Sequence, residues 1–315
     1  MKQLTFTLLV FISVGLLSCR KNENYPDITQ YDATNIQNYI KANGLTGMKR
    51  DTTDGDTSGI YYQILGQGST AGTPLDYSDT VKFVFTLKSF DGKYNSIDSL
   101  TTNHYDGFLG HINTSGLPKG LQIAIHNLIK YRGTRARVLI PSRLAYGVHG
   151  YGSGSASNVN TRIAGNQCLD YYINLYSDQT TYDDQVIKNY ISANGLTGYV
   201  KVTSGPSAGY YYKVNTPGTG LNVINQYSSF TATYSGKFLT GTEFDAGLSN
   251  GAASTFDLAN SSFVAGVTQG LQGYTAGAVV SLLLPSRLGY GRIGNTGIAA
   301  NNCLRFDFTI VTVAN

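Results

Sequence analysis

The chain has 315 residues, of which 41% are hydrophobic and 13% are charged, and its formal net charge is +4 at pH 7. This length allows two domains with a buried core each, which excludes a small peptide that needs disulfide staples. The 23 Lys and Arg residues are scattered along the sequence, so we expect no nucleic-acid partner. With 37 Gly, 24 Tyr, 7 Pro and no Trp, the composition favours short strands and tight turns.

The first segment is predicted to be a targeting sequence. Lys2 precedes an apolar run over residues 4–17 that is too short to span a bilayer and is typical of a signal peptide. The run ends in Leu-Leu-Ser-Cys19, which resembles the lipobox of bacterial lipoproteins, in which the cysteine becomes the acylated N-terminus. The alternative is an ordinary signal peptide in which Cys19 has no role.

The lipobox resemblance implies how the chain is held in the cell. Residues 1–18 are then the lipoprotein signal peptide, residues 19–33 are a tether, and the acyl chains on Cys19 bind the lipid bilayer. The expected location is the bacterial cell envelope, lipid-anchored on the periplasmic side or at the outer-membrane surface.

Two segments recur later in the chain, which indicates a tandem duplication. Residues 38–47, NYIKANGLTG, return as NYISANGLTG over residues 189–198. Residues 141–147, PSRLAYG, return as PSRLGYG over residues 285–291. Because the order and the approximate spacing are kept at a period of this size, the pattern predicts two whole domains rather than a solenoid. We place them at residues 34–176 and 182–315, with a linker over residues 177–181.

Each copy is predicted to open with a short helix followed by a strand. Ile36, Tyr39 and Ile40 fall at i, i+3 and i+4 and so line one helix face, as do their counterparts in the second copy. Gly44 and Gly195 end these helices. The strands are expected over residues 60–65 and 210–214.

The second copy continues with an alternating strand that contains Phe230, Ala232 and Tyr234. A helix is expected over residues 267–274, an apolar strand over 279–284 and a closing strand over 304–313, whose counterpart in the first copy is 169–175. Several antiparallel strands with one internal helix indicate the α+β class.

The cysteines and the candidate metal ligands do not predict a disulfide or a metal site. Cys168 and Cys303 occupy equivalent places in the two copies, so we predict buried free thiols rather than a disulfide. No metal site is expected, because the candidate ligands lack a third histidine partner or the acidic residue that closes a calcium loop; these candidates are His104 and His111, and Asp51, Asp54 and Asp56.

An aromatic constellation with one carboxylate runs through the second copy, and its order resembles the FKBP family of peptidyl-prolyl isomerases. Six motifs carry the resemblance over residues 210–313: Tyr234-Ser-Gly, Phe244-Asp245, Phe256-Asp-Leu, Phe263-Val264-Ala-Gly, PSRLGYG with Tyr290, and LRFDF with Phe306. The resemblance implies two tandem FKBP-like domains, each an antiparallel sheet curved around one short helix and preceded by an extra N-terminal helix.

The resemblance also implies a site and an activity. Tyr290 is expected to donate a hydrogen bond to the substrate carbonyl, and Asp245 to lie beside that carbonyl and to order Tyr234. The remaining expected pocket residues bind the proline-containing polypeptide substrate, without a cofactor: Phe244, Phe256, Phe263, Val264, Val267, Ile298 and Phe306.

Two departures from the family pattern affect the expected activity. Val267 stands where the family usually has a tryptophan at the pocket floor, which predicts a wider pocket. In the first copy Tyr94-Asn95 stands for Phe244-Asp245, so that copy has no carboxylate there and is expected to be degenerate.

The sequence therefore predicts a peptidyl-prolyl cis-trans isomerase that acts on exported proteins, with its activity in the second domain. The alternative is a non-catalytic chaperone or a peptide- or glycan-binding lipoprotein that keeps the FKBP fold. A purely structural envelope protein, with no pocket ligand, is a third possibility.

Overall fold

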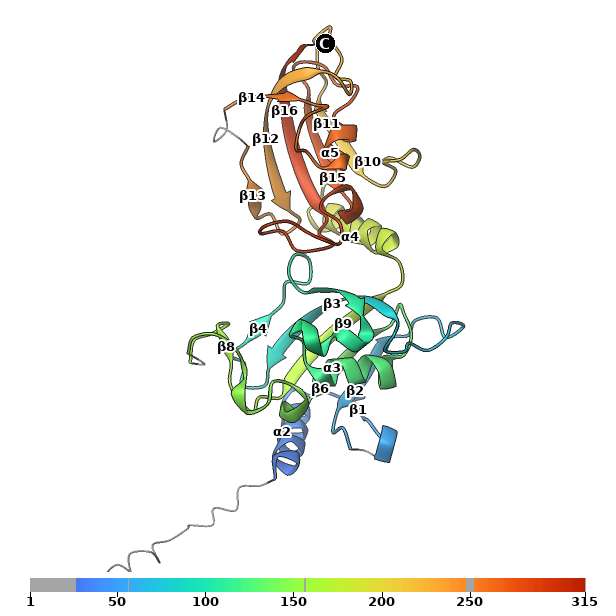
Figure 1. The fold of residues 1–315 in the computed structure, drawn as a ribbon, viewed down its shortest axis with the longest axis vertical. Coiled ribbons are helices and arrows are strands. Elements are labelled where there is room, and N and C mark those ends of the chain that lie inside the picture. The colour runs from blue at the N-terminus through green and yellow to red at the C-terminus, as the bar shows by residue number, and fades with distance from the viewer. Residues whose placement is uncertain (1–26, 56, 156, 248–251, 315) are drawn as a thin grey trace, which may run out of the picture.

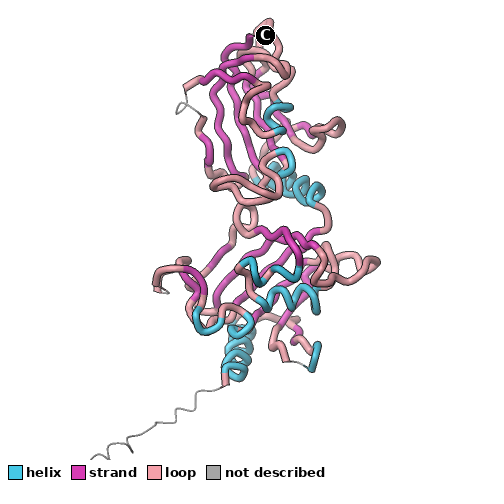
Figure 2. The backbone as a smooth tube through the Cα atoms, in the orientation of Figure 1, coloured by secondary structure: helices cyan, strands magenta, loops and turns pink. Residues whose placement is uncertain are grey.

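The structure, a computed structural model, describes residues 27–314 except 56, 156 and 248–251. Figure 1 shows two units stacked along the long axis, and each is built around one antiparallel sheet (Figure 2). The predicted signal peptide, the predicted lipidation site Cys19 and most of the predicted tether lie outside the described residues. Within residues 27–314, apart from those gaps, no helix combines the length and the apolar character needed to cross a bilayer.

The first unit holds a seven-stranded sheet in the order β1-β2-β6-β9-β3-β4, with β5 also paired to β3. Its strands are β1 (Lys49–Arg50), β2 (Tyr61–Gly66), β3 (Thr80–Ser89), β4 (Asn95–Ser96), β5 (His104–Phe108), β6 (Arg135–Ile140) and β9 (Leu169–Tyr176). A separate two-stranded ribbon is formed by β7 (Tyr151–Gly152) and β8 (Arg162–Ile163).

The second unit repeats this topology. Its order is β10-β11-β15-β16-β12-β13, with β14 also paired to β12. Its strands are β10 (Val200–Lys201), β11 (Tyr211–Thr216), β12 (Ser229–Phe238), β13 (Glu243–Asp245), β14 (Ser254–Asp257), β15 (Val279–Leu284) and β16 (Leu304–Ala314). The identical order confirms the predicted duplication and the α+β class.

A helix of 15 residues opens each unit, where a short helix was predicted, and both helices begin earlier than expected. Residues 28–33, expected to belong to the tether, are part of the first of these helices. The two helices are α2 (Ile28–Ala42) and α4 (Gln179–Ala193), and their N-caps are Asp27 and Asp178, whose carboxylates accept backbone N–H bonds from the first turn. Since α4 begins at Gln179, only residues 177–178 remain of the expected linker. Gly44 and Gly195 follow the helix ends at φ +58° and +59°, a conformation that suits glycine.

The two faces of each sheet bind different helices. Leu139 on β6 packs with Ile36 of α2, whereas its neighbours Val138 and Ile140 belong to the main core of the unit. Because side chains alternate across a strand, α2 and the main core lie on opposite faces of the sheet. Leu283, between Leu282 and Leu284 on β15, has the same role beneath α4.

The main core of each unit is closed by one short internal helix. In the second unit this is α5 (Ala265–Gly270), which is shorter than predicted; in the first it is α3 (Lys119–Ala124), continued by a π-helical turn, η4 (Ile125–Ile129). Glycine is required where the helix meets the sheet, since a Cβ on Gly266 would lie 2.7 Å from the Leu284 side chain and one on Gly120 would lie 2.4 Å from that of Ile140.

Buried polar groups also fix the opening helices. Asp183 of α4 is 1% exposed and accepts hydrogen bonds from the backbone and the hydroxyl of Ser286 at 2.9 and 2.7 Å. Asp32 of α2 is 2% exposed and accepts from the backbone of Arg143 at 3.2 Å. The thiols of Cys168 and Cys303 are buried and free, which confirms the prediction for the cysteines. The Cys168 thiol lies 3.5 Å from the Asp32 carboxylate, and the Cys303 thiol lies 4.0 Å from the Asp183 backbone carbonyl.

A second carboxylate on α4, Asp184, is bound by three donors. Lys188 and Lys201 approach it at 2.7 and 2.6 Å, and the Tyr211 hydroxyl donates to it at 2.8 Å. Burial by itself raises the pKa of the Asp184 carboxyl, but these hydrogen bonds outweigh it and lower the pKa to about 2.

Because of this lowered pKa, the contribution of Asp184 to the free energy of unfolding should depend on pH. The pKa of an unfolded aspartate is about 3.9, so the contribution is fully present at neutral pH and is lost as the pH falls from about 4 through 2. We expect Asp184→Asn to destabilise the protein by about 1 kcal/mol at pH 7, after allowance for solvent screening. Urea unfolding at pH 7 and at the lowest pH at which the chain stays folded would measure it. An equal loss at both pH values would contradict the prediction.

The two units contact each other through polar groups. Asp106 of β5 has a side chain that is 4% exposed and accepts two hydrogen bonds from Arg292, at 2.9 and 2.7 Å, and one from Asn301 at 3.1 Å. A ring nitrogen of His104 lies 3.0 Å from the Ala300 carbonyl. In Figure 1 the loop before β5 accordingly reaches the loop before β16.

Candidate functional site

The predicted aromatic residues of the second unit gather around one pocket of about 290 Å³. Tyr234 comes from β12, Asp245 from β13 and Phe256 from β14, all on neighbouring strands. Further predicted residues that line it are Phe263, Val264, Tyr290 and Phe306. The fold thus brings together seven of the ten residues that the sequence assigned to the site, from segments more than 70 residues apart along the chain.

The walls of this pocket are aromatic rings packed against one another. Tyr234 and Phe263 meet edge to face, with ring centroids 5.5 Å apart at 82°, and Phe256 and Phe263 are tilted, with centroids 4.9 Å apart at 44°. Phe306 is 3% and Phe256 is 8% exposed, so these rings are anchored in the core. Contacts between rings in these arrangements are favourable and give the pocket apolar walls.

One carboxylate lies at the rim of the aromatic walls. Asp245 accepts the hydroxyl proton of Tyr234 at 2.7 Å through Oδ2, and the backbone N–H of Gly247 at 3.0 Å through Oδ1. Burial and this hydrogen bond raise the pKa of Tyr234 well above its usual value. The phenol therefore stays protonated at neutral pH, and the pair fixes the orientation of the Tyr234 ring.

Tyr290 contributes the second polar group of the pocket. It lies in the loop after η7 (Ser286–Leu288), and it is half-buried against the core of the second unit. Among the residues that the structure describes, none is hydrogen-bonded to its hydroxyl, whereas the equivalent Tyr146 of the first unit donates to the Gly116 carbonyl at 3.2 Å. The Tyr290 hydroxyl is thus placed to donate to a bound ligand.

Three predicted site residues stand behind the pocket wall instead of lining it. Val267 is 0% and Ile298 is 6% exposed, and both belong to the main core. Phe244 packs edge-on against Phe306, with centroids 5.8 Å apart at 84°. Their effect on a ligand is therefore indirect, through the position of the rings in front of them.

The sequence interpretation missed a polar side of the pocket. β14 adds Thr255 and Asp257, and the segment between β14 and α5 adds Asn260, Ser261 and Ser262. Asp257 accepts the Asn260 side-chain amide at 2.8 Å. The spacing Asp257-x-x-Asn260 is typical of a turn, and that was the signal available in the sequence.

The equivalent region of the first unit has a different chemistry. Leu87 stands where the second unit has Gly236, and the residue opposite Leu87 is Ser96, whereas Asp245 lies opposite Gly236. Neither Ser96 nor the neighbouring Asn95 carries a carboxylate. Leu121 and Tyr171, at the floor, are 0% exposed. The first unit keeps the aromatic core of the site without its acid.

Tyr171 carries a polar atom into that core. Among the described residues, its hydroxyl is buried without a hydrogen-bond partner, and the equivalent residue of the second unit is Phe306. Because an unsatisfied buried hydroxyl costs about 1–3 kcal/mol, we expect Tyr171→Phe to leave the stability unchanged or to raise it by about 1 kcal/mol. Thermal unfolding would measure this. A clear loss of stability would show that the hydroxyl is bonded in solution.

Of the candidate metal ligands, Asp56 and the side chain of Asp54 lie outside what the structure describes. Within the described part of the chain, no group of three or more His, Cys, Asp or Glu side chains is arranged to hold an ion. Asp51 instead accepts the backbone N–H of Thr53 and the hydroxyl of Ser58, and His104 lies at the contact between the units.

Part of the second unit matches a known family model. Residues 222–311 match the family model described as FKBP-type peptidyl-prolyl cis-trans isomerase. The chain is 30% identical over 116 residues to FkpA of Buchnera aphidicola subsp. Schizaphis graminum, which covers 37% of this chain and 45% of that protein. It is 32% identical over 126 residues to FkpA of Aeromonas hydrophila, which covers 40% of this chain and 45% of that protein. The chain spans about half the length of the curated relatives it matches.

Two solved structures are similar to parts of the chain. The crystal structure of FkpA from Escherichia coli is 26% identical with a TM-score of 0.36, and the match covers 42% of this chain and 60% of that one. The three FKBP domains of wheat FKBP73 are 17% identical with a TM-score of 0.33, over 85% of this chain and 99% of that one. Because these TM-scores are low, the fold assignment rests on the family match and on the repeated sheet order.

Proposed function

We propose that the second unit, whose residues 222–311 match the model of FKBP-type peptidyl-prolyl cis-trans isomerases, is a member of that family and that this chain catalyses the rotation of X-Pro peptide bonds in polypeptide substrates. The observation that carries the proposal is the pocket in which Tyr234, Asp245 and Tyr290 meet between aromatic walls. The first unit, which lacks the carboxylate, is proposed to bind chains or to act as a spacer.

The chemistry required of such a pocket is modest. Rotation about a peptide bond has a barrier of about 18–20 kcal/mol, because resonance gives the C–N bond partial double-bond character. This resonance places negative charge on the carbonyl oxygen, and the charge is greatest in the planar ground state. A water-poor aromatic pocket therefore disfavours the planar amide relative to the twisted one, which lowers the barrier.

We assign the roles of the side chains on this basis. The substrate proline ring packs between Phe256, Phe263 and Phe306, and the free hydroxyl of Tyr290 donates to a substrate carbonyl. Asp245 holds Tyr234 in place through their 2.7 Å hydrogen bond, and its carboxylate lies beside the substrate carbonyl. No step needs a nucleophile or a proton transfer, because no covalent bond is broken.

The test is the cis-to-trans relaxation of X-Pro peptides in the presence of the chain from residue 20 onward. Uncatalysed relaxation takes tens to hundreds of seconds, so modest acceleration is measurable. We expect Asp245→Ala and Tyr290→Phe to reduce the acceleration about tenfold or more, since each removes a group aimed at the substrate. Ser96→Ala, the change at the equivalent register position of the first unit, should leave it intact.

Two outcomes would contradict this proposal. Turnover that is unchanged by Asp245→Ala would remove the assigned site. The absence of acceleration by the intact chain, together with peptide binding that does not depend on proline, would instead favour the alternative of a non-catalytic chaperone or a peptide- or glycan-binding protein.

The cellular location is proposed from the N-terminal sequence. Lys2, the apolar run and Cys19 support a lipid-anchored protein of the bacterial envelope whose clients are exported proteins. Mass spectrometry of the membrane fraction should find the chain beginning at an acylated Cys19, and Cys19→Ser should release it from the membrane. Recovery of unmodified chain with residues 1–18 attached would contradict this assignment.

A further inference from the structure

The two units differ at one position on their opening helices, and the difference leaves a cavity in the first. In the repeat alignment, residues 38–47 correspond to 189–198, so Ala33 of α2 corresponds to Asp184 of α4. The strands agree with this alignment: Arg50 lies opposite Tyr61 on β1 and β2, as Lys201 lies opposite Tyr211 on β10 and β11. The first unit thus has an alanine where the second has a carboxylate.

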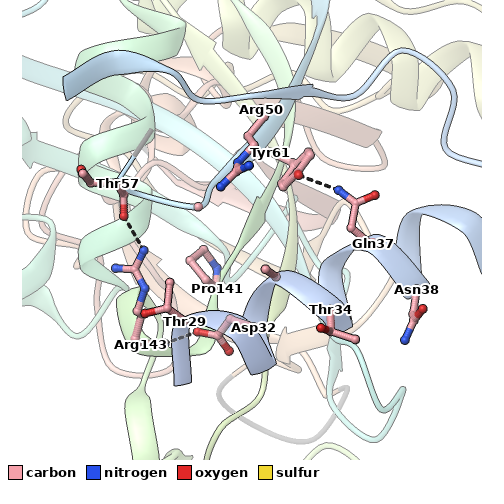
Figure 3. A pocket seen from close by; sticks show the side chains of 12 residues that line it. Thr29, Asp32, Thr34, Gln37, Asn38, Arg50, Thr57, Tyr61, Pro141 and Arg143 are labelled. Carbon is pink, nitrogen blue, oxygen red and sulfur yellow. Dashed lines mark hydrogen bonds between the residues drawn. The ribbon is translucent and has the colours of Figure 1, made fainter. Parts of the chain in front are cut away.

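The groups that bind Asp184 in the second unit have polar counterparts in the first. Lys201 is matched by Arg50, Tyr211 by Tyr61 and Lys188 by Gln37. All three counterparts, with Ala33 itself, line a pocket of about 380 Å³ between α2 and β1-β2 (Figure 3). The donors have therefore been kept while the acceptor on the helix has been lost.

Figure 3 shows how these groups are arranged around the cavity. The Tyr61 hydroxyl accepts a hydrogen bond from the Gln37 amide at 2.5 Å, and its own proton has no acceptor among the described residues. Tyr211 gives the corresponding proton to Asp184 at 2.8 Å. Arg50 already has an interaction partner, but its guanidinium carries five N–H donors and can bind a second group.

Among the described residues that line the pocket, two positive side chains face one acid. The positive groups are the guanidinium groups of Arg50 and Arg143, which lie in its walls. Arg143 donates to two neutral groups, the backbone carbonyls of Thr57 and Ser58, both at 2.6 Å. The acid, Asp32, is 2% exposed and its Oδ2 accepts from the Arg143 backbone at 3.2 Å. The described lining thus carries an excess of positive charge, which favours an anion.

We propose that this pocket of the first unit binds a carboxylate group of another molecule, in the place that Asp184 fills in the second unit. Arg50 and the Tyr61 hydroxyl donate to the carboxylate, and Gln37 orients the hydroxyl. The carboxylate is an acidic side chain or the C-terminus of a polypeptide, and either would give the first unit a binding function of its own. This proposal does not depend on isomerase activity, because the pocket lies on α2 and β1-β2, away from the aromatic site.

The test uses small probes that separate the two sources. N-acetyl-glutamate amide carries only a side-chain carboxylate, N-acetyl-alanine only a terminal one, and N-acetyl-glutamine amide carries none. Titrated into the chain from residue 20 onward, at least one of the first two should shift the NMR signals of Arg50 and Tyr61 saturably. The neutral probe should not. Equal shifts with all three probes would overturn the proposal.

Reciprocal variants provide the matched control. Ala33→Asp places the carboxylate on α2, where Arg50 and Tyr61 can bind it, so it should abolish probe binding while the chain stays folded. Asp184→Ala should open the equivalent site and allow the probe to shift the signals of Lys201 and Tyr211. If Ala33→Asp folds and still binds the probe with unchanged affinity, the assignment of the pocket is wrong.

Discussion

Replacement of Phe308 by alanine is expected to lower the free energy of unfolding of the second unit by about 3–5 kcal/mol. Phe308 is 1% exposed at the centre of β16, where it stacks on Tyr234 with centroids 5.2 Å apart and meets Phe263 edge-on at 5.7 Å. The loss combines the transfer of the ring out of water with the cavity that its removal leaves. Because Tyr234 and Phe263 line the pocket, the same change should also loosen its walls.

Urea unfolding followed by circular dichroism would measure this loss. Val311→Ala on the same strand is the control, since that side chain is 48% exposed and should cost well under 1 kcal/mol. Equal effects of the two substitutions would contradict the position of Phe308 in the core.

Replacement of Asp106 by alanine is expected to uncouple the two units. The carboxylate accepts from Arg292 and Asn301 across the contact and lies 3.5 Å from Lys82 within its own unit. Its removal leaves three donors without their acceptor, and we expect a loss of about 2 kcal/mol, less than for a fully buried pair because Arg292 is 62% exposed.

Scanning calorimetry of the whole chain tests this. We expect Asp106→Ala to separate the unfolding transition into two, one for each unit, whereas Asp76→Ala, at a side chain that is 72% exposed, should not. A double-mutant cycle with Arg292→Ala should give a coupling energy of about 1–2 kcal/mol. No coupling would mean that the two side chains do not interact in solution.

The sequence predicted those features that local periodicity and repetition encode. The repeated segments predicted two units of one topology, and the i, i+3, i+4 pattern of Ile36, Tyr39 and Ile40 predicted the opening helices. The starts of these helices were missed because Asp27 and Asp178, which cap them, precede the apolar pattern. The helix over residues 265–270 is shorter than the pattern predicted. It ends at Gly270, where the close approach of the Leu282 side chain requires a glycine.

The candidate site was predicted from the family resemblance. The pattern of neighbouring residues in the sequence would not have predicted it. Tyr234 and Asp245 are hydrogen-bonded across neighbouring strands, a contact set by sheet register. Resemblance could not distinguish residues that line the pocket from Val267 and Ile298 behind it, since both kinds are apolar. The contact of Asp106 with Arg292 joins residues 186 positions apart and has no local signal.

The two units have the same strand order, so each strand could pair with the equivalent partner strand of the other unit while the chain is being synthesised. Tandem domains are prone to such an exchange of equivalent elements. The ladders differ in a way that opposes this. β13 has an extra residue, Phe244, where it pairs with β12 between Gly236 and Lys237, whereas β4 pairs with β3 without a shift. A Cβ on Gly236 would lie 2.7 Å from the Phe244 ring, and β3 has Leu87 at the place of Gly236. With β13 in place of β4, Phe244 would therefore meet the Leu87 side chain, which disfavours domain swapping between the two halves of the chain.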